Sequence, residues 1–341
     1  MNSDGTTDEI KRTGVSGISY YQLENGQYVD AQTGQIVKVE GEPELSDRFR
    51  DIWGIIVATL AGIGVFTSFC MFIYLLVVYP NKSGASILGY MLAFGIVLLY
   101  ALIFIFILHA TRELCAMRKF LLGVCYCMCY ASLFVKMVDC WRCKDYREEK
   151  EIKYKKLGHP FGLFVCTMLL VLVQVMISTE WMILEKPELE KILYNNFIWP
   201  RCTPSNFYDA NLFLSLVYVM FLILLTIFFG VASLRNPKNH YEARWICGIA
   251  VLSVPVWVLF GLVASLGPIR MGDAAIAIGL LLNATIMLFL GPMRKLYLLH
   301  KFQETLDEEE HKSQLNGHSQ RGSKWLCNTI VPFFIRPPII Q

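Results

Sequence analysis

Seven apolar stretches divide this chain, and polar segments separate them. A helix of about 20 apolar residues is long enough to cross the hydrocarbon core of a bilayer. The pattern therefore predicts an all-α membrane protein whose seven-transmembrane helix bundle consists of the spans Ile52–Tyr79, Ala85–Leu108, Leu114–Lys136, Phe161–Leu184, Ala210–Leu234, Trp245–Leu266 and Ala274–Leu290.

Polar segments flank the predicted bundle, which gives three parts: residues 1–51, the bundle at 52–299, and a tail at 300–341. The first part alternates polar and apolar residues around Asn25-Gly26 and Thr33-Gly34, which are turn signals. A lone hairpin is marginally stable in water, and about 50 residues are too few for a two-lobed ligand-capture domain. We expect most of this part to be disordered, with a small hairpin as the alternative.

The composition agrees with a membrane protein and limits its partners. Hydrophobic residues make up 55% of the chain, and the mean hydropathy is +0.46, both above the values typical of soluble domains. The formal net charge of +3 is too small to indicate a nucleic-acid partner. We therefore expect membrane lipid around the bundle and no nucleic acid.

The basic residues of the short loops predict the orientation. The links after the second, fourth and sixth spans carry five basic residues, namely Arg112, Lys186, Lys191, Arg201 and Arg270. The links after the first, third and fifth spans carry eleven, namely Lys82, Arg142, Lys144, Arg147, Lys150, Lys153, Lys155, Lys156, Arg235, Lys238 and Arg244. Since cytoplasmic loops are enriched in Lys and Arg, we expect an extracellular N-terminus and a cytoplasmic C-terminus. Arg118 and Lys119, at the outer end of the third span, weaken this count without reversing it.

Eleven cysteines are present, and nine of them fall within spans or on the predicted cytoplasmic side, where thiols usually stay reduced. Only Cys115 and Cys202 face outward. A disulfide between them would tie the loop before the fifth span across the mouth of the bundle. We favour this structural role over a redox role.

The remaining cysteines indicate no metal site. Cys140 and Cys143 could be mistaken for half of one, but no second pair has the required spacing. Palmitoylation close to the membrane, or no modification, is the better interpretation. Cys327 lies in an apolar tail segment too short to span, where acylation and a free thiol are alternatives. We expect no metal and no cofactor.

The spans contain little that would support transport or catalysis. Ala274–Leu290 has no lysine for a retinal Schiff base, and ionisable residues are lacking at mid-membrane, where an ion path would need them. Neither paired carboxylates nor a histidine cluster occurs within any predicted helix. We therefore expect no enzyme and no catalytic residues.

The third span carries a resemblance to a known receptor family. Cys115-Ala-Met-Arg118, then Gly123, then Tyr130-Ala-Ser-Leu-Phe-Val-Lys136 resembles the third span of class C G-protein-coupled receptors. Arg235-Asn236, Glu242-Ala-Arg244 and Trp257 are similar to that family's third intracellular link and sixth span. The resemblance extends over nearly all of Ile52–Tyr297.

Within class C, four features look most like the retinoic-acid-inducible orphan receptors and the bride-of-sevenless proteins. They are the short N-terminal part, Trp53-Gly-Ile, Gly64-Val-Phe-Thr-Ser, and the pattern from Val173-Gln174 to Glu180. The family's Arg-Glu after the first intracellular turn is absent here. Its Pro-Lys-x-Tyr is stretched to Pro292-Met-Arg-Lys295-Leu-Tyr297.

Lys136 and Glu242 lie at the predicted cytoplasmic ends of the third and sixth spans. An ion pair between them would hold these ends together, and breaking it would open a cleft for a G protein. In the alternative, both side chains only extend to the membrane interface, as long charged side chains at helix ends commonly do.

Trp257 follows Pro255 about twelve residues into the sixth span, so we expect a bulky aromatic side chain near a kink. Tyr126, Phe260 and Asn283 are candidates to line the same cavity. The alternative is that Trp257 only fills space or anchors the helix at the interface.

The resemblance implies an orphan class C-like receptor in the plasma membrane. It would relay a signal from an unknown extracellular ligand to a heterotrimeric G protein through movement of the third and sixth helices. A homo- or heterodimer is a further expectation. The alternative is a non-signalling seven-helix scaffold, or a ligand presented on the membrane to another cell's receptor.

Overall fold

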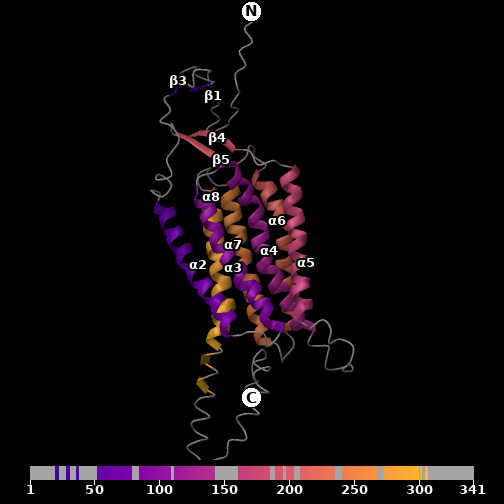
Figure 1. The fold of residues 1–341 in the computed structure, drawn as a ribbon. Helices are drawn as coiled ribbons and strands as arrows, with labels where there is room; N and C mark the ends of the chain where they lie inside the picture. Colours follow the sequence, from indigo (N-terminus) through magenta and orange to yellow (C-terminus); the bar gives the residue numbers. More distant parts are fainter. Residues whose placement is uncertain are drawn as a thin grey trace, which may run out of the picture.

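The protein's structure, a computed structural model, describes residues 20–22, 28–30, 36–37, 52–78, 84–108, 111–142, 160–184, 189–194, 197–202, 208–234, 240–266, 272–298, 300–301 and 304–305. Seven long helices form one bundle (Figure 1). They are α2 (Ile52–Val78), α3 (Gly84–Ile107), α4 (Arg112–Arg142), α5 (Pro160–Leu184), α6 (Tyr208–Leu234), α7 (His240–Leu266) and α8 (Gly272–Leu288). A π-helical turn, η3 (Phe289–Met293), follows α8 and contains Pro292.

All seven helices are long and apolar enough to cross a membrane, which confirms the predicted spans. Six of them begin earlier than the hydropathy pattern predicts, and α4 and α7 differ most from their predicted spans. The helix α4 runs from Arg112 to Arg142 instead of from Leu114 to Lys136, and α7 begins at His240 instead of Trp245. Hydropathy marks the hydrocarbon core, whereas backbone hydrogen bonds continue the helix past its edge.

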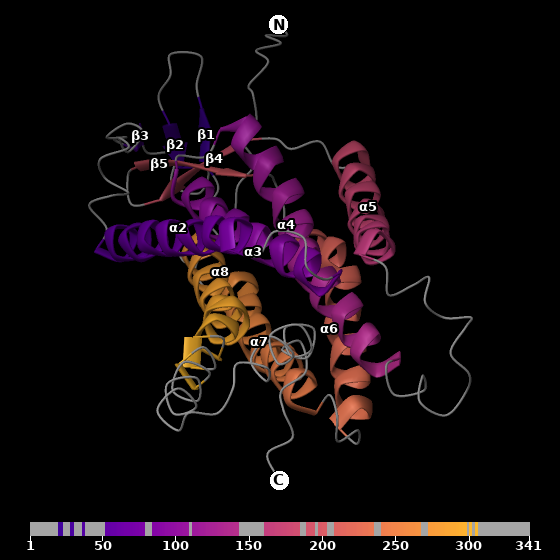
Figure 2. The same ribbon diagram turned by 60° about the horizontal axis from the view of Figure 1, so that its bottom comes forward.

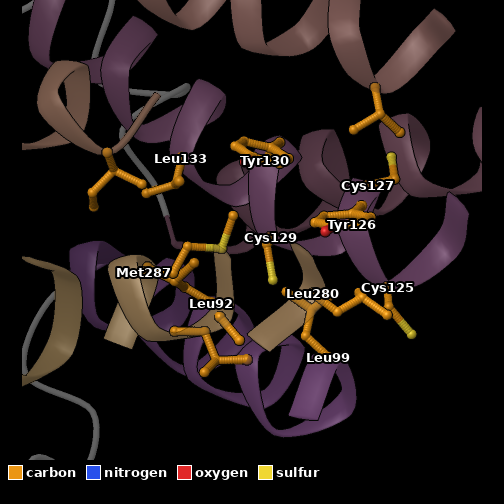
Figure 3. Packing of buried hydrophobic residues seen from close by; sticks show 14 of the residues in the cluster. Leu92, Leu99, Cys125, Tyr126, Cys127, Cys129, Tyr130, Leu133, Leu280 and Met287 are labelled. Atoms are coloured by element: carbon orange, nitrogen blue, oxygen red, sulfur yellow. The ribbon is translucent and has the colours of Figure 1, made fainter. Parts of the chain in front are cut away.

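The helix α4 is the centre of the bundle. It packs against α3, α5 and α6, while α5 and α6 have far less contact with each other (Figure 2). Its buried side chains belong to the main core. Figure 3 shows Tyr126 and Cys129 of α4 beside Leu99 of α3 and Leu280 and Met287 of α8. The helix α4 is therefore a reference against which movements of α3, α5 and α6 can be described.

The outer faces of the helices are apolar and exposed. Phe66 of α2, Phe161 and Ile183 of α5, and Phe228 of α6 are examples. In water such surfaces would be unfavourable, but in a bilayer they contact lipid tails. This distribution is the one expected of a helix bundle surrounded by membrane lipid.

A small antiparallel sheet precedes the first helix in the sequence. The strands β1 (Tyr20–Gln22), β2 (Tyr28–Asp30) and β3 (Ile36–Val37) form a three-stranded antiparallel sheet. The small hairpin kept above as the alternative is thus present as β1–β2, with a third strand beside it. The expected disorder concerns the rest of residues 1–51, which lies outside the described residues.

A second hairpin was not predicted. The strands β4 (Leu189–Tyr194) and β5 (Phe197–Cys202) pair from Leu189 opposite Cys202 to Tyr194 opposite Phe197. Asn195-Asn196 between them is a pair that tolerates the positive φ of a tight turn. Pro200 within the second strand obscured this signal, because proline is confined to edge strands. The hairpin identifies one end of the bundle, which we call the hairpin end (Figure 1).

Small residues permit the close packing of α3 on α4. A Cβ atom added at Gly95 of α3 would lie 2.7 Å from Sγ of Cys129. Cys129 is itself fully buried and cannot move aside. A Cβ atom at Gly89, two turns earlier on the same helix, would meet nothing within 4 Å. The two glycines therefore make a matched pair.

We predict that Gly95→Ala destabilises the bundle by about 1–3 kcal/mol, because the new methyl group overpacks the α3–α4 contact. Gly89→Ala should instead stabilise it by about 0.4–1 kcal/mol, since alanine restricts the unfolded chain. The melting temperatures of the purified proteins in detergent micelles measure both effects. Equal melting temperatures for the two variants would contradict the close packing.

Candidate functional site

A disulfide joins the hairpin to the bundle. Cys115, in the first turn of α4, and Cys202, at the end of β5, form a bond with an S–S distance of 1.99 Å and a Cα–Cα distance of 5.4 Å. Both residues are buried. The predicted disulfide is confirmed, and it fixes β5 against the start of α4.

Arg118 lies one turn further along α4 and is a residue that the sequence reasoning missed. Its side chain is only 2% exposed and forms an ion pair with Asp273 of α8, with an Nη1–Oδ2 distance of 3.2 Å. It also donates hydrogen bonds to backbone carbonyl oxygens at the end of α3. The available signal was a charged residue inside an apolar span, which usually has a specific partner. The loop-charge count had treated it only as one more basic residue.

At the opposite end of the bundle, which we call the Lys136 end, α4 and α7 are joined by an ion pair. Nζ of Lys136 lies 2.6 Å from Oε1 of Glu242, and the two side chains are 15% and 28% exposed. The thiol of Cys140 donates to the other carboxylate oxygen of Glu242 at 3.8 Å. Lys295, beyond η3, is close enough to both charged residues to interact with them electrostatically. The carboxylate of Glu242 thus interacts with two lysines.

The position of Cys140 argues against lipidation at this residue. Its side chain is buried and its sulfur contacts Glu242, so an acyl chain there would have to break the contact between α4 and α7. The other lipidation candidates, Cys143 and Cys327, lie outside the described residues. Within the described part of the chain, no group of three His, Cys, Asp or Glu side chains is placed to hold a metal ion.

Three of the residues predicted to line a cavity meet in the middle of the bundle. The ring of Tyr126 on α4 lies 4.6 Å from that of Trp257 on α7, measured between centroids, with the planes tilted by 54°. The amide nitrogen Nδ2 of Asn283 on α8 donates to the hydroxyl of Tyr126 at 3.3 Å. The structure therefore brings α4, α7 and α8 together at Tyr126. Pro255 lies inside α7 two residues before Trp257.

Phe260 has a different neighbour. It lies against Gly279 of α8, where an added Cβ would be 3.1 Å from the Cβ of Phe260. It therefore belongs to the contact between α7 and α8, one turn from Trp257. Among the described residues, Phe260 makes no ring contact with Tyr126, unlike Trp257.

Polar atoms without well-formed hydrogen bonds lie around Tyr126. Oδ1 of Asn283 is buried and accepts no hydrogen bond within the described part of the chain, whereas the buried hydroxyl of Tyr130 and Nε1 of Trp257 lie close to each other without a well-formed hydrogen bond. Buried polar groups nearly always have a partner, often an ordered water. Buried polar atoms from α4, α7 and α8 are thus gathered around Tyr126.

Comparison with known proteins identifies the family. Residues 47–291, well over half of the chain, match the family described as "7 transmembrane sweet-taste receptor of 3 GCPR". The chain belongs to the class C G-protein-coupled receptors. The expected resemblance is thereby confirmed, and this class C protein is a multi-pass protein of the plasma membrane. Its family is one of receptors, not of enzymes.

Several curated relatives belong to one group within this family. The class C chain is 29% identical to "G-protein coupled receptor family C group 5 member C" of Bos taurus over 63% of its length and 50% of the relative's. It is 27% identical to member C of Mus musculus, over 70% and 56%. It is 25% identical to member B of Mus musculus, over 65% and 52%. The chain thus spans about half the length of the curated relatives it matches, and the group agrees with the expected orphan subgroup.

We predict that Cys115→Ser and Cys202→Ser each lower stability by about 2–5 kcal/mol, and that the double variant is no worse, because the same bond is lost. Melting temperature and surface expression measure the loss. Cys166→Ser is the matched control, since Cys166 is an exposed free cysteine on α5. Mass spectrometry of unreduced peptides that finds both thiols free would contradict the disulfide.

Proposed function

We propose that this class C receptor relays an extracellular or membrane-borne signal to a heterotrimeric G protein by moving α4 and α7 relative to each other. The observation that carries the proposal is the ion pair between Lys136 and Glu242. This pair joins α4 to α7 at the Lys136 end of the bundle through opposite charges. Its partial burial makes it a stronger restraint than an exposed pair, which contributes about 0–1 kcal/mol.

The loop charges support an orientation in which the Lys136 end faces the cytoplasm. The basic residues concentrate in the links at that end, including Lys82, Arg235 and Lys238. The N-terminus and the β4–β5 hairpin are then extracellular. In this orientation the ion pair lies where a G protein would approach.

The helix α7 is suited to swing. Pro255 removes one backbone hydrogen bond inside α7, which makes bending easier at that point. The contact of Trp257 with Tyr126 lies next to it. A change at this contact would alter the direction of the half of α7 that carries Glu242 and would separate Glu242 from Lys136. A cleft between α4 and α7 would then open for the G protein.

The region around Tyr126 is where we propose that a ligand or a rearranged water acts. The buried polar atoms of Tyr130, Trp257 and Asn283 supply both donors and acceptors, and the first two come from α4 and α7, the helices that would move. A ligand shifts the equilibrium only if it binds one state better, so it must contact these groups differently in the two states. A homo- or heterodimer remains a prediction.

We predict that neutralising the pair, by Lys136→Met or Glu242→Gln, raises signalling without ligand, because the resting state loses an attraction that the active state lacks. A change of about 1.4 kcal/mol shifts the ratio of the two states about tenfold. G-protein activation in a cell reporter, at matched surface expression and against cells without the receptor, measures the change.

Two further variants sharpen this test. Exchanging the charges, by Lys136→Glu with Glu242→Lys, should restore part of the resting state, because the two side chains can still pair and Lys295 still faces one lysine and one carboxylate. Arg244→Gln is the matched control, since Arg244 is exposed on α7 two residues after Glu242 and has no ion pair with a described residue. Unchanged basal output in the single variants would refute the lock and favour the scaffold alternative.

A further inference from the structure

Arg118 is a buried cation at the hairpin end whose position no signalling step above explains. It follows Cys115 by three residues on α4 and is 2% exposed. A guanidinium group has five N–H donors, and leaving donors of a buried cation without acceptors would be costly. The acceptors around Arg118 therefore show what holds it there.

Three of the five N–H groups donate hydrogen bonds to the end of α3. Nε donates to the carbonyl oxygen of Ile105 at 3.0 Å, and Nη2 donates to those of Phe106 and Leu108 at 3.3 and 2.8 Å. The last carbonyl groups of a helix lack partners within the helix and carry the negative end of its dipole. The side chain of Arg118 thus caps α3 from the neighbouring helix.

The other two donors, both on Nη1, reach two further elements. One goes to Oδ2 of Asp273, in the first turn of α8, at 3.2 Å. The other goes to Sγ of Cys202, at the end of β5, at 3.7 Å. All five N–H groups therefore have acceptors. A single side chain of α4 thus bonds to the end of α3, to α8 and to the hairpin.

We infer that Arg118 is a positioning residue that couples the β4–β5 hairpin to the first turn of α8. A displacement of the hairpin moves Cys202, Cys202 is in contact with the guanidinium, and the guanidinium holds Asp273. A partner that binds the hairpin thereby shifts α8, the helix that also carries Asn283 beneath Tyr126. The inference rests on the proposed receptor function for its purpose, but the coupling is measured without any signalling.

A purely structural role is the competing explanation, and a double-mutant comparison separates the two. Hydrogen–deuterium exchange of residues 272–282 is measured in purified receptor in lipid nanodiscs. The proteins are the wild type, Arg118→Met, the double variant Cys115→Ser with Cys202→Ser, and the variant with all three changes. Loss of the disulfide should accelerate exchange in this segment about fivefold or more when Arg118 is present, as expected for one lost hydrogen bond.

After Arg118→Met, loss of the disulfide should add nothing in the same segment, because the connection to α8 is already broken. Independent effects that simply multiply would overturn the coupling. So would exchange in residues 272–282 that does not respond to loss of the disulfide in the presence of Arg118.

Asp273→Asn keeps the test decisive if Arg118→Met does not fold. This variant should accelerate exchange about fivefold in residues 272–282 and leave the α3 end, residues 104–108, unchanged, because Arg118 still caps α3. Equal acceleration in both segments, or in neither, would overturn the assignment.

Lys119→Met is the matched control, because Lys119 is the adjacent buried cation on α4. Its Nζ lies 6.0 Å from the ring centroid of Trp181 on α5, and its loss should change exchange in neither segment. Coupling without any G-protein activation would leave this inference standing and remove the proposed function.

Discussion

Hydrocarbon offers no hydrogen bonds, so each polar group within the seven helices must be satisfied by the protein itself. Most hydroxyl groups solve this locally. Thr59, Thr67 and Thr226, for example, donate to the carbonyl oxygen four residues earlier in their own helix. These hydroxyl groups therefore need no hydrogen-bond partner on a neighbouring helix. The groups that cannot be satisfied locally are the ones that determine how the helices are arranged.

The charged ones connect α4 to its neighbours, and several neutral ones join the helices around it. Arg118 bonds to α3 and α8, and Lys136 pairs with Glu242 of α7. Gln174 of α5 donates from its amide to the carbonyl oxygen of Ser215 on α6, next to Gly123 of α4, where a side chain would displace it. The two charged contacts lie at opposite ends of α4. In the function proposed above, one would hold the bundle where a signal arrives, and the other where it leaves.

The spans could be predicted from the sequence because hydrophobic length is a local property, and the disulfide could be predicted because only two cysteines remained on one side. The pairing of Lys136 with Glu242 came from the resemblance, since their separation in the sequence carries no information about distance. The partners of Arg118 could not be predicted. They are backbone carbonyls at the end of one helix and a carboxylate at the start of another, and only tertiary packing brings them together. The β4–β5 hairpin was missed for a different reason. Proline is unusual within strands, and Pro200 lies in β5.

The contact between Arg118 and Asp273 also has a consequence for the order of events during synthesis. The two residues are 155 positions apart, and Asp273 belongs to the last of the seven helices. While the chain is being made, α4 must therefore enter the bilayer before the carboxylate that neutralises its buried cation exists. By contrast, the hydroxyls of Thr59 and Thr67 on α2 are already bonded within that helix, so these groups need no partner from a later segment. A chain that stops before α8 leaves Arg118 without this carboxylate at the membrane surface, a defect that quality control in the secretory pathway could recognise.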